Sequence, residues 1–196
     1  MNAFIRIFLF ALLFAGAACA EMDKDEQMSG QHKAVLSGYQ EVPAVYSPGS
    51  GSAVVESDET GKSIKVTLSY SNLKGVAKAA HIHFGQEGVN GGIVAALCGA
   101  DGKPACPAQA SDLSVTIVAA DVKAVQGLEA ASLDAVLEAL SHNALYVNVH
   151  TDKFADGEIR GQLRRGRGQG GNDEDKGKDK ESTENHGSGH GKGSGK

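Results

Sequence analysis

The sequence predicts a mostly β protein, an antiparallel, Greek-key-like sandwich or barrel of about eight strands with one short helix. Short runs rich in β-branched residues recur through residues 33–163, and Gly-rich turns separate them. One of these runs, residues 64–70, alternates strictly between apolar and polar side chains, as a half-buried strand does. There is no Trp, but Val, Leu, Ile and Ala suffice to fill one core in a domain of this length.

The strands are expected in a regular order along the domain. The first three are predicted at residues 34–37, 52–56 and 64–70, with a hairpin turn at 58–61 before the third. The alternation in the third strand places four apolar side chains on one face: Ile64, Val66, Leu68 and Tyr70. Five more strands are predicted at residues 77–84, 93–97, 113–119, 144–151 and 157–163.

One helix interrupts the strands at residues 133–140. Its apolar residues have the i, i+3, i+4, i+7 spacing of a helix with one buried face: Leu133, Val136, Leu137 and Leu140. Ser132 precedes the helix and is expected to cap it. We expect the helix to lie across the sheet as a lid or crossover, with His142 interacting favourably with its C-terminal dipole.

Residues 1–20 have the layout of a secretory signal peptide. Arg6 precedes a short apolar run, and the segment ends in Ala18-Cys19-Ala20, which offers small side chains at both positions that a signal peptidase reads. A helix needs about 20 apolar residues to cross a bilayer, and this run is shorter. No other stretch is apolar enough to span one. We expect cleavage after Ala20 and export to the periplasm or the extracellular space, with a lipoprotein acylated at Cys19 as the alternative.

The two ends of the exported chain differ from its centre. Residues 21–32 are predicted to be a linker, and residues 164–196 a disordered tail of Gly and charged residues without aliphatic or aromatic side chains. His186 and His190 could hold a metal ion weakly, although a solvated tail is the favoured interpretation. Acidic residues outnumber basic ones in residues 21–163, which argues against nucleic acid as a partner.

Cys98 and Cys106 would remain in the mature chain, where an oxidising compartment favours a disulfide between them. The residues between them form a short, turn-rich loop, so the bond would constrain one loop and not the whole fold. A pair of soft metal ligands is the alternative, although the Cys-x-x-Cys spacing of zinc sites is missing.

The histidines indicate a metal site. A strand has a period of two, so His81 and His83 share one face of residues 77–84, and His150 lies on the polar face of residues 144–151. If both strands direct their apolar faces into one core, the three imidazoles lie on the outer surface of the sheet or at its rim. Neutral imidazole nitrogens suit copper and zinc ions.

Two other interpretations of these strands stay open. The histidines could be structural, forming hydrogen bonds to Thr151, Asn148 or a neighbouring carbonyl group that hold the strands in register. Arg160 could pair with Glu158 or with an opposing acid, which would add less than about 1 kcal/mol if exposed. No Gly-x-Ser-x-Gly nucleophile motif occurs, so we do not expect a catalytic site.

Several blocks of the sequence resemble the CHRD domain, named for its occurrence in chordin. They span residues 33–163 in the expected order and comprise Leu36-Ser37-Gly38-Tyr39-Gln40-Glu41-Val42-Pro43, Ala80-His81-Ile82-His83-Phe84-Gly85, residues 91–98 with Cys106-Pro107, Tyr146-Val147-Asn148-Val149-His150-Thr151 and Gly157-Glu158-Ile159-Arg160-Gly161-Gln162-Leu163. Ala155-Asp156 replaces the usual Pro or Gly before the last block. The resemblance implies an extracellular β domain, found singly in bacteria and repeated in chordin, but it does not supply a defined molecular activity.

The His-x-His pair with a later His is also similar to part of the copper site of Cu,Zn superoxide dismutases. Those enzymes use a further, metal-bridging His and a loop of zinc ligands, whereas residues 86–112 contain no His, which disfavours dismutase activity. The sequence therefore predicts an exported, non-enzymatic binding protein with a single copper ion on His81, His83 and His150. The alternative is an extracellular module that binds a protein or matrix partner and uses the histidines structurally.

Overall fold

The structure is a computed structural model that describes residues 30–166. The predicted signal peptide with Cys19, most of the linker, and His186 and His190 of the tail lie outside the described residues. The elements, in chain order, are β1 (His32–Ser37), the 3-10 turn η1 (Gly38–Gln40), β2 (Ser50–Ser57), β3 (Ser63–Ser71), β4 (Ala77–Phe84), β5 (Gly92–Cys98), β6 (Ala110–Val118), the 3-10 turn η2 (Ala119–Asp121), α2 (Leu133–Ser141), β7 (Leu145–Thr151), β8 (Ile159–Gln162) and β9 (Arg164–Arg165).

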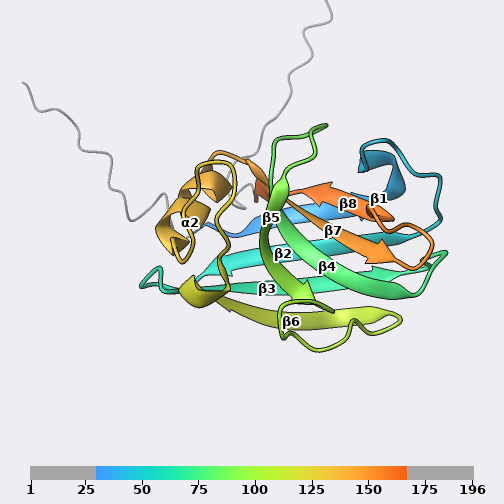
Figure 1. Ribbon diagram of the computed structural model, residues 1–196, viewed down its shortest axis with the longest axis horizontal. Coiled ribbons are helices and arrows are strands. Elements are labelled where there is room, and N and C mark those ends of the chain that lie inside the picture. Colours follow the sequence, from blue (N-terminus) through green and yellow to red (C-terminus); the bar gives the residue numbers. More distant parts are fainter. Residues whose placement is uncertain (1–29, 167–196) are drawn as a thin grey trace, which may run out of the picture. The chain divides into compact units, whose positions relative to one another are not determined.

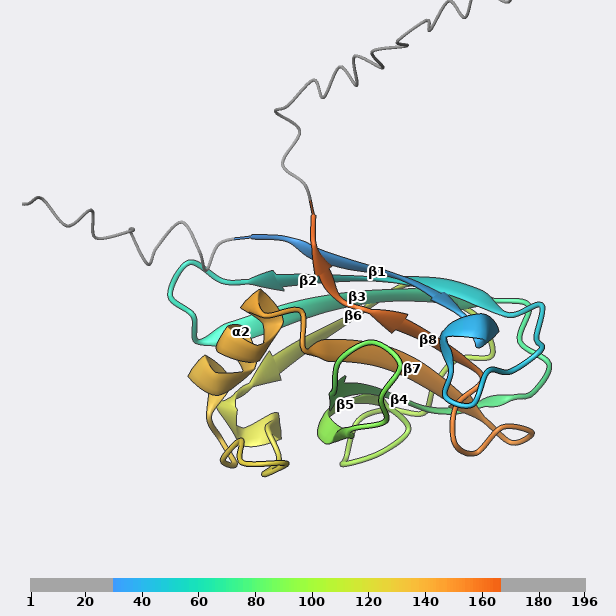
Figure 2. The same ribbon diagram turned by 90° about the horizontal axis from the view of Figure 1, so that it is seen from above.

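All strand pairs in the described chain are antiparallel, and they form one sheet in the order β5-β4-β7-β8-β1-β2-β3-β6. The sheet curls over, so that β1, β2, β3 and β6 form one layer and β5, β4, β7 and β8 form the other (Figures 1 and 2). This arrangement confirms the predicted antiparallel sandwich or barrel with one helix. The chain changes layer three times, between β3 and β4, between β5 and β6 and between β6 and β7, which brings together strands that are distant in sequence.

The core lies between the two layers. The alternation predicted for β3 is confirmed, since Ile64, Val66, Leu68 and Tyr70 are all buried. Across the core, β4 and β7 contribute buried apolar side chains to the same cluster: Ala80, Ile82, Leu145, Val147 and Val149. Both strands therefore direct their apolar faces inward, and their polar faces point to the opposite side.

Helix α2 forms the crossover from β6 to β7 at one end of the sheet (Figure 1), where it buries Leu133, Val136, Leu137 and Leu140 as predicted. The expected cap was wrong, because the side chain of Ser132 makes no capping hydrogen bond. Ser132 adopts φ −92° and ψ 86°, outside the extended conformation that N-cap residues usually have. Its carbonyl group still accepts a bond from the amide of Val136.

The described domain also contains a disulfide bond and a short final strand. Cys98 and Cys106 form the expected disulfide, with Cα atoms 5.0 Å apart. Strand pairing continues past Leu163, because Arg164 and Arg165 of β9 pair with Lys33 and His32 of β1. Among residues 30–166, no helix is long and apolar enough to cross a membrane.

Candidate metal centre

The three histidines predicted as ligands come together on the polar face of β4 and β7. The antiparallel register places His81 opposite Asn148 and His83 opposite Tyr146. Residues directly opposite in such a pair project to the same side of the sheet, and His150 follows Asn148 by two residues on that side. The local strand period and the β4–β7 register together therefore bring the three imidazoles side by side.

This face lies on the outer side of the sheet, one of the two positions that the sequence suggested, but it is not exposed to solvent. His81 and His83 are each only 7% exposed and His150 is partly buried. The reason is that loops fold back over the strands. The loop after β4 reaches His83 at Gly91, and the turn after β7 reaches His150 at Ala155. The histidines therefore lie in a second, polar interior beside the apolar core.

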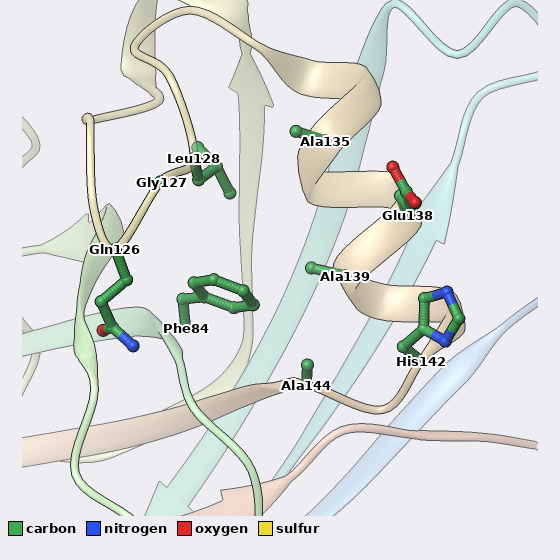
Figure 3. A pocket seen from close by; sticks show the side chains of 9 residues that line it. All are labelled: Phe84, Gln126, Gly127, Leu128, Ala135, Glu138, Ala139, His142 and Ala144. Carbon is green, nitrogen blue, oxygen red and sulfur yellow. The ribbon is translucent and has the colours of Figure 1, made fainter.

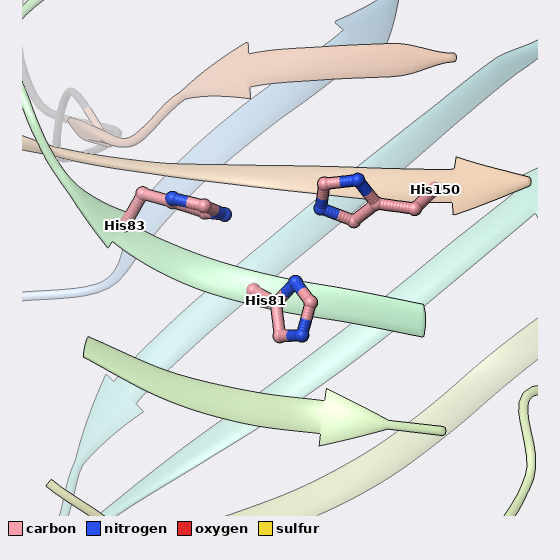
Figure 4. A group of neighbouring side chains, drawn as sticks. All are labelled: His81, His83 and His150. Atoms are coloured by element: carbon pink, nitrogen blue, oxygen red, sulfur yellow. The ribbon is translucent and has the colours of Figure 1, made fainter. Parts of the chain in front are cut away.

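The three rings converge on one point. Figure 4 shows one nitrogen of each ring directed at the space between them, and the ligand atoms all lie within 4.8 Å of one another. The ring centroids are 4.9 Å apart for His81 and His150, 5.6 Å for His81 and His83, and 6.1 Å for His83 and His150. Histidine rings this close, each at a large angle to the nearest other histidine ring, resemble the ligands of one small ion.

Backbone carbonyl groups set the orientation of two rings. His83 Nδ1 lies 2.9 Å from the carbonyl oxygen of Gly91, and His150 Nδ1 lies 2.8 Å from that of Ala155. An oxygen acceptor requires Nδ1 to carry the proton in each ring, which leaves Nε2 as an unprotonated lone pair. Metal-binding histidines commonly donate their second nitrogen in this way.

The opposite nitrogens have no partner in residues 30–166. Seven buried side-chain atoms lack a hydrogen bond there, and three of them are His81 Nδ1, His83 Nε2 and His150 Nε2. A buried polar atom without a partner costs about 1–3 kcal/mol, so three such atoms around one point need an explanation. A cation at that point would satisfy all three.

The surroundings keep the three rings neutral. Burial lowers the pKa of His81 to about 4, and the adjacent His150 and His83 reinforce the shift because nearby imidazolium charges repel. Burial also lowers the pKa of His83 and of His150, although their carbonyl hydrogen bonds, and for His83 the carboxamide of Asn148, act in the opposite direction. Neutral imidazole is the form that binds a metal ion.

The geometry is compatible with one transition-metal ion. Nitrogens bound at about 2.0–2.1 Å in tetrahedral geometry stand about 3.3 Å apart, so small side-chain rotations would close the present spacing. Among the described residues, the group contains no Cys, Asp or Glu. A neutral all-imidazole set of this kind could hold a borderline ion such as copper or zinc, and suits calcium or magnesium poorly.

Tyr146 and Arg160 continue the site away from the ion position. The Tyr146 ring stacks on His83 with centroids 4.8 Å apart and 8° between the planes. The guanidinium group of Arg160 covers the Tyr146 ring at 3.5 Å and donates to the carbonyl oxygens of Gln86 and Val89 and to Asn90 Oδ1. Arg160 therefore holds the loop whose Gly91 carbonyl orients His83.

Arg160 does not pair with Glu158, one of the two kinds of partner that the sequence left open for it. Arg160 is only 2% exposed and faces residues 86–90, whereas the Glu158 carboxylate is fully buried elsewhere. Glu158 accepts hydrogen bonds from four groups: the hydroxyls of Ser47 and Thr151 and the amides of Lys74 and Gly75. These bonds lower the pKa of Glu158 against the opposing effect of burial. No sequence pattern indicated either role, because both depend on loops distant in the chain.

A separate apolar groove of about 470 Å³ lies beside α2. Figure 3 shows the Phe84 ring between the turn at Gln126 and the helix, with Glu138 and His142 farther along α2. The groove shares no residue with the histidine cluster. His142 thus lines this groove, and its amide caps the last turn of the helix by bonding to the carbonyl of Glu138.

The fold and the site define a small antiparallel β domain with a buried three-histidine cluster between two central strands. The family model of the CHRD domain matches residues 32–163, and the chain belongs to this family. Comparison with curated proteins and with solved structures finds no match. Both His-containing blocks and the final Gly-Glu-Ile-Arg-Gly block that characterise the resemblance meet around the histidine cluster.

Proposed function

We propose that this protein is an exported, non-enzymatic CHRD-domain protein that binds one copper ion through His81, His83 and His150. One observation carries the proposal: three buried, neutral imidazole nitrogens without partners lie within 4.8 Å of one another. A structural role explains the hydrogen bonds of His83 and His150 to carbonyl groups, but it does not explain why the opposite nitrogens face each other.

Copper is favoured by the donor set. Imidazole suits both copper and zinc, and in the Irving–Williams order a given nitrogen site binds Cu²⁺ more tightly than Zn²⁺. Export, proposed from the sequence of residues 1–20, would place the domain where it meets metal ions outside the cytoplasm. A non-enzymatic role is proposed because the sequence contains no nucleophile motif and membership of the CHRD family supplies no defined molecular activity.

The test is a copper titration monitored by calorimetry and electron paramagnetic resonance. Because His186 and His190 could bind copper independently, the full chain should carry His186→Ala and His190→Ala in every sample. We expect one equivalent of copper to bind, and the additional His81→Ala/His83→Ala substitutions to abolish this binding. His142→Ala is the matched control, because it removes a histidine outside the cluster and should leave the affinity unchanged.

Full affinity in the His81→Ala/His83→Ala protein would contradict the proposal, provided that its near-ultraviolet circular dichroism shows a native fold. A superoxide dismutation assay of the copper-loaded protein checks the non-enzymatic assignment. Turnover above that of free copper would overturn that part of the proposal.

A second candidate is an extracellular interaction module. Its support is the exposure of large side chains near η1, where Tyr39 is 69% and Tyr46 is 78% exposed. Such aromatic side chains are enriched in protein interfaces. Binding of a purified protein partner that is insensitive to chelator and to histidine substitution, but lost in Tyr39→Ser/Tyr46→Ser, would favour this function.

A further inference from the structure

A fourth unpartnered atom lies at the histidine cluster. Asn148 is only 2% exposed, and within residues 30–166 its side-chain oxygen Oδ1 has no hydrogen-bond partner. Leaving a buried amide oxygen unsatisfied costs about 1–3 kcal/mol. Because Asn148 lies in the middle of β7, between strands on both sides, neither fraying nor solvent at an edge relieves this cost.

The register places Asn148 on the strand face that carries the three histidines. Asn148 lies directly opposite His81, and on its own strand it precedes His150 by two residues, so it shares their face. Its carboxamide also interacts with the ring of His83. Three nitrogen lone pairs and one oxygen lone pair thus share one face without a donor between them.

Acceptors that face each other repel unless a positive group lies between them. One proton cannot serve all four atoms. A metal ion can, because it accepts electron pairs from several directions at once. The carboxamide oxygen is a neutral donor that cannot be lost by protonation near neutral pH.

We propose that Asn148 Oδ1 is the fourth donor of the site, so that His81, His83, His150 and Asn148 form a four-coordinate N3O centre. This inference rests on the proposed metal-binding function and sharpens it. An oxygen donor favours a divalent ion, Cu²⁺ or Zn²⁺, over the softer Cu⁺. The four ligands carry no negative charge, so the bound ion keeps its full +2 charge. The site therefore binds a divalent ion less tightly than a site with a carboxylate ligand would.

If the Asn148 carboxamide has its other orientation, the expected effect of removing it on metal affinity is reversed. Turned by 180° about its last torsion, Asn148 would direct Nδ2 at His83 Nε2 and donate a hydrogen bond to it. That bond would occupy one of the three imidazole lone pairs and close the site. Removing the side chain would then strengthen metal binding, whereas removing a ligand weakens it.

Two substitutions separate these cases in the full chain lacking the tail histidines. Asn148→Leu keeps the branched shape and the number of heavy atoms of the side chain, although it is larger, and removes both polar atoms. We expect it to weaken Cu²⁺ and Zn²⁺ binding about 10- to 100-fold, the range known for groups that support a metal site. Cu⁺ affinity, measured by competition with a chromophoric Cu⁺ chelator, should change by less than about threefold, because Cu⁺ is satisfied by the imidazoles.

Asn148→Asp keeps the shape of the side chain and places a carboxylate oxygen at the same position. We expect tighter Cu²⁺ binding and a changed parallel hyperfine coupling in the electron paramagnetic resonance spectrum, since the equatorial donor becomes anionic. If the side chain at position 148 did not face the ion, the carboxylate would not reach it and the spectrum would stay unaltered. Asn148→Asp therefore keeps the test decisive if Asn148→Leu fails to fold.

The outcomes distinguish this inference from the proposed function. If His81→Ala abolishes copper binding while Asn148→Leu binds Cu²⁺ as tightly as the parent protein or more tightly, the fourth-donor assignment is overturned and the three-histidine site stands. An Asn148→Asp spectrum identical to the parent spectrum overturns it as well. If His81→Ala leaves copper binding intact, both proposals fail together.

Discussion

Individual side chains in this domain are placed by partners that are far away in sequence. Glu41 is an example, because its carboxyl group packs against Gly157 at the opposite end of the domain sequence. Gly157 has φ +129°, a conformation that side chains disfavour, and a Cβ atom there would collide with Glu41 Oε1. Burial raises the pKa of Glu41 to about 7, although nearby Arg160 opposes the shift.

The raised pKa of Glu41 predicts a pH-dependent loss of stability. The folded protein holds the Glu41 proton up to about pH 7, whereas the unfolded chain releases it near the ordinary glutamate pKa of 4.5. Stability therefore falls as the pH rises through this window. The free energy of unfolding of the parent should fall by about 2 kcal/mol more than that of Glu41→Gln when the pH is raised from 5 to 8.

Urea unfolding of both proteins at the two pH values measures this difference. The comparison is specific for Glu41, because the histidines, which titrate in the opposite sense below pH 6.5, contribute equally to both proteins. A constant difference between the two proteins would show that Glu41 is ionised in the folded state.

At the scale of elements, the pairs β4–β7 and β7–β8 build the candidate centre row by row. His81, Asn148 and Arg160 occupy one cross-strand row, and His83, Tyr146 and Gln162 occupy the next. Side chains in such rows contact one another directly. The last block of the CHRD sequence thus supports the first His-containing block through the intervening strand β7.

Arg160 is predicted to be the main anchor of the loop at residues 86–90. Arg160→Met should lower the free energy of unfolding by about 3 kcal/mol, because it leaves buried carbonyl groups of this loop without a donor. It should also weaken copper binding by releasing the Gly91 carbonyl that orients His83. Chemical denaturation and copper titration test the two effects.

Arg164→Met is the matched control. Arg164 pairs with Glu87 of the same loop, but both side chains are more than half exposed. Exposed ion pairs contribute about 0–1 kcal/mol, so this substitution should have little effect on stability or copper binding. Equal effects of the two substitutions would refute the anchoring role of Arg160.

The elements were largely predictable from the sequence, whereas the site was predictable only in part. The period of two placed His81 and His83 on one face, and the helical spacing identified the buried side of α2, because both patterns are local. That β4 pairs with β7 is a long-range choice with no local signal. The burial of the histidines was missed for the same reason, since it depends on where Gly91 and Ala155 lie after folding.

Asn148 also shows that local sequence patterns do not reveal long-range register or burial. Its position in the strand placed it on the polar face, and the sequence suggested it as a hydrogen-bond partner of a histidine. Only the register opposite His81, together with 2% exposure, distinguishes it from an ordinary polar strand residue. Ser132 shows the converse, because a favourable capping residue lacks the backbone conformation that capping requires.

At the scale of the whole molecule, the described domain combines an apolar core between two layers of sheet with a polar interior under loops. The Cys98–Cys106 disulfide closes the loop that follows β5, the strand beside the histidine-bearing β4. Such bonds persist in oxidising compartments, which agrees with the export proposed from residues 1–20.

Export predicts a defined mature chain. The protein isolated from its native host should begin at Glu21, and its intact mass should be lower by two hydrogens than that of the fully reduced chain, as a Cys98–Cys106 bond requires. Mass spectrometry before and after reduction measures both. A chain that begins at an acylated Cys19 would establish the lipoprotein alternative, and retention of residues 1–20 would refute export by this signal.

The pairing of β4 with β7 also determines when a metal ion could act. His150 is synthesised long after His81 and His83, and the three meet only when β7 adds to β4. Until then this site offers only the His81 and His83 imidazoles, so an ion at the site would bind the folded state in preference to the unfolded one. Free metal at about 100 times its Kd would then add about 2.7 kcal/mol to the stability of the domain. Metal supply would thus raise the equilibrium stability of the completed fold without directing the order in which its strands assemble.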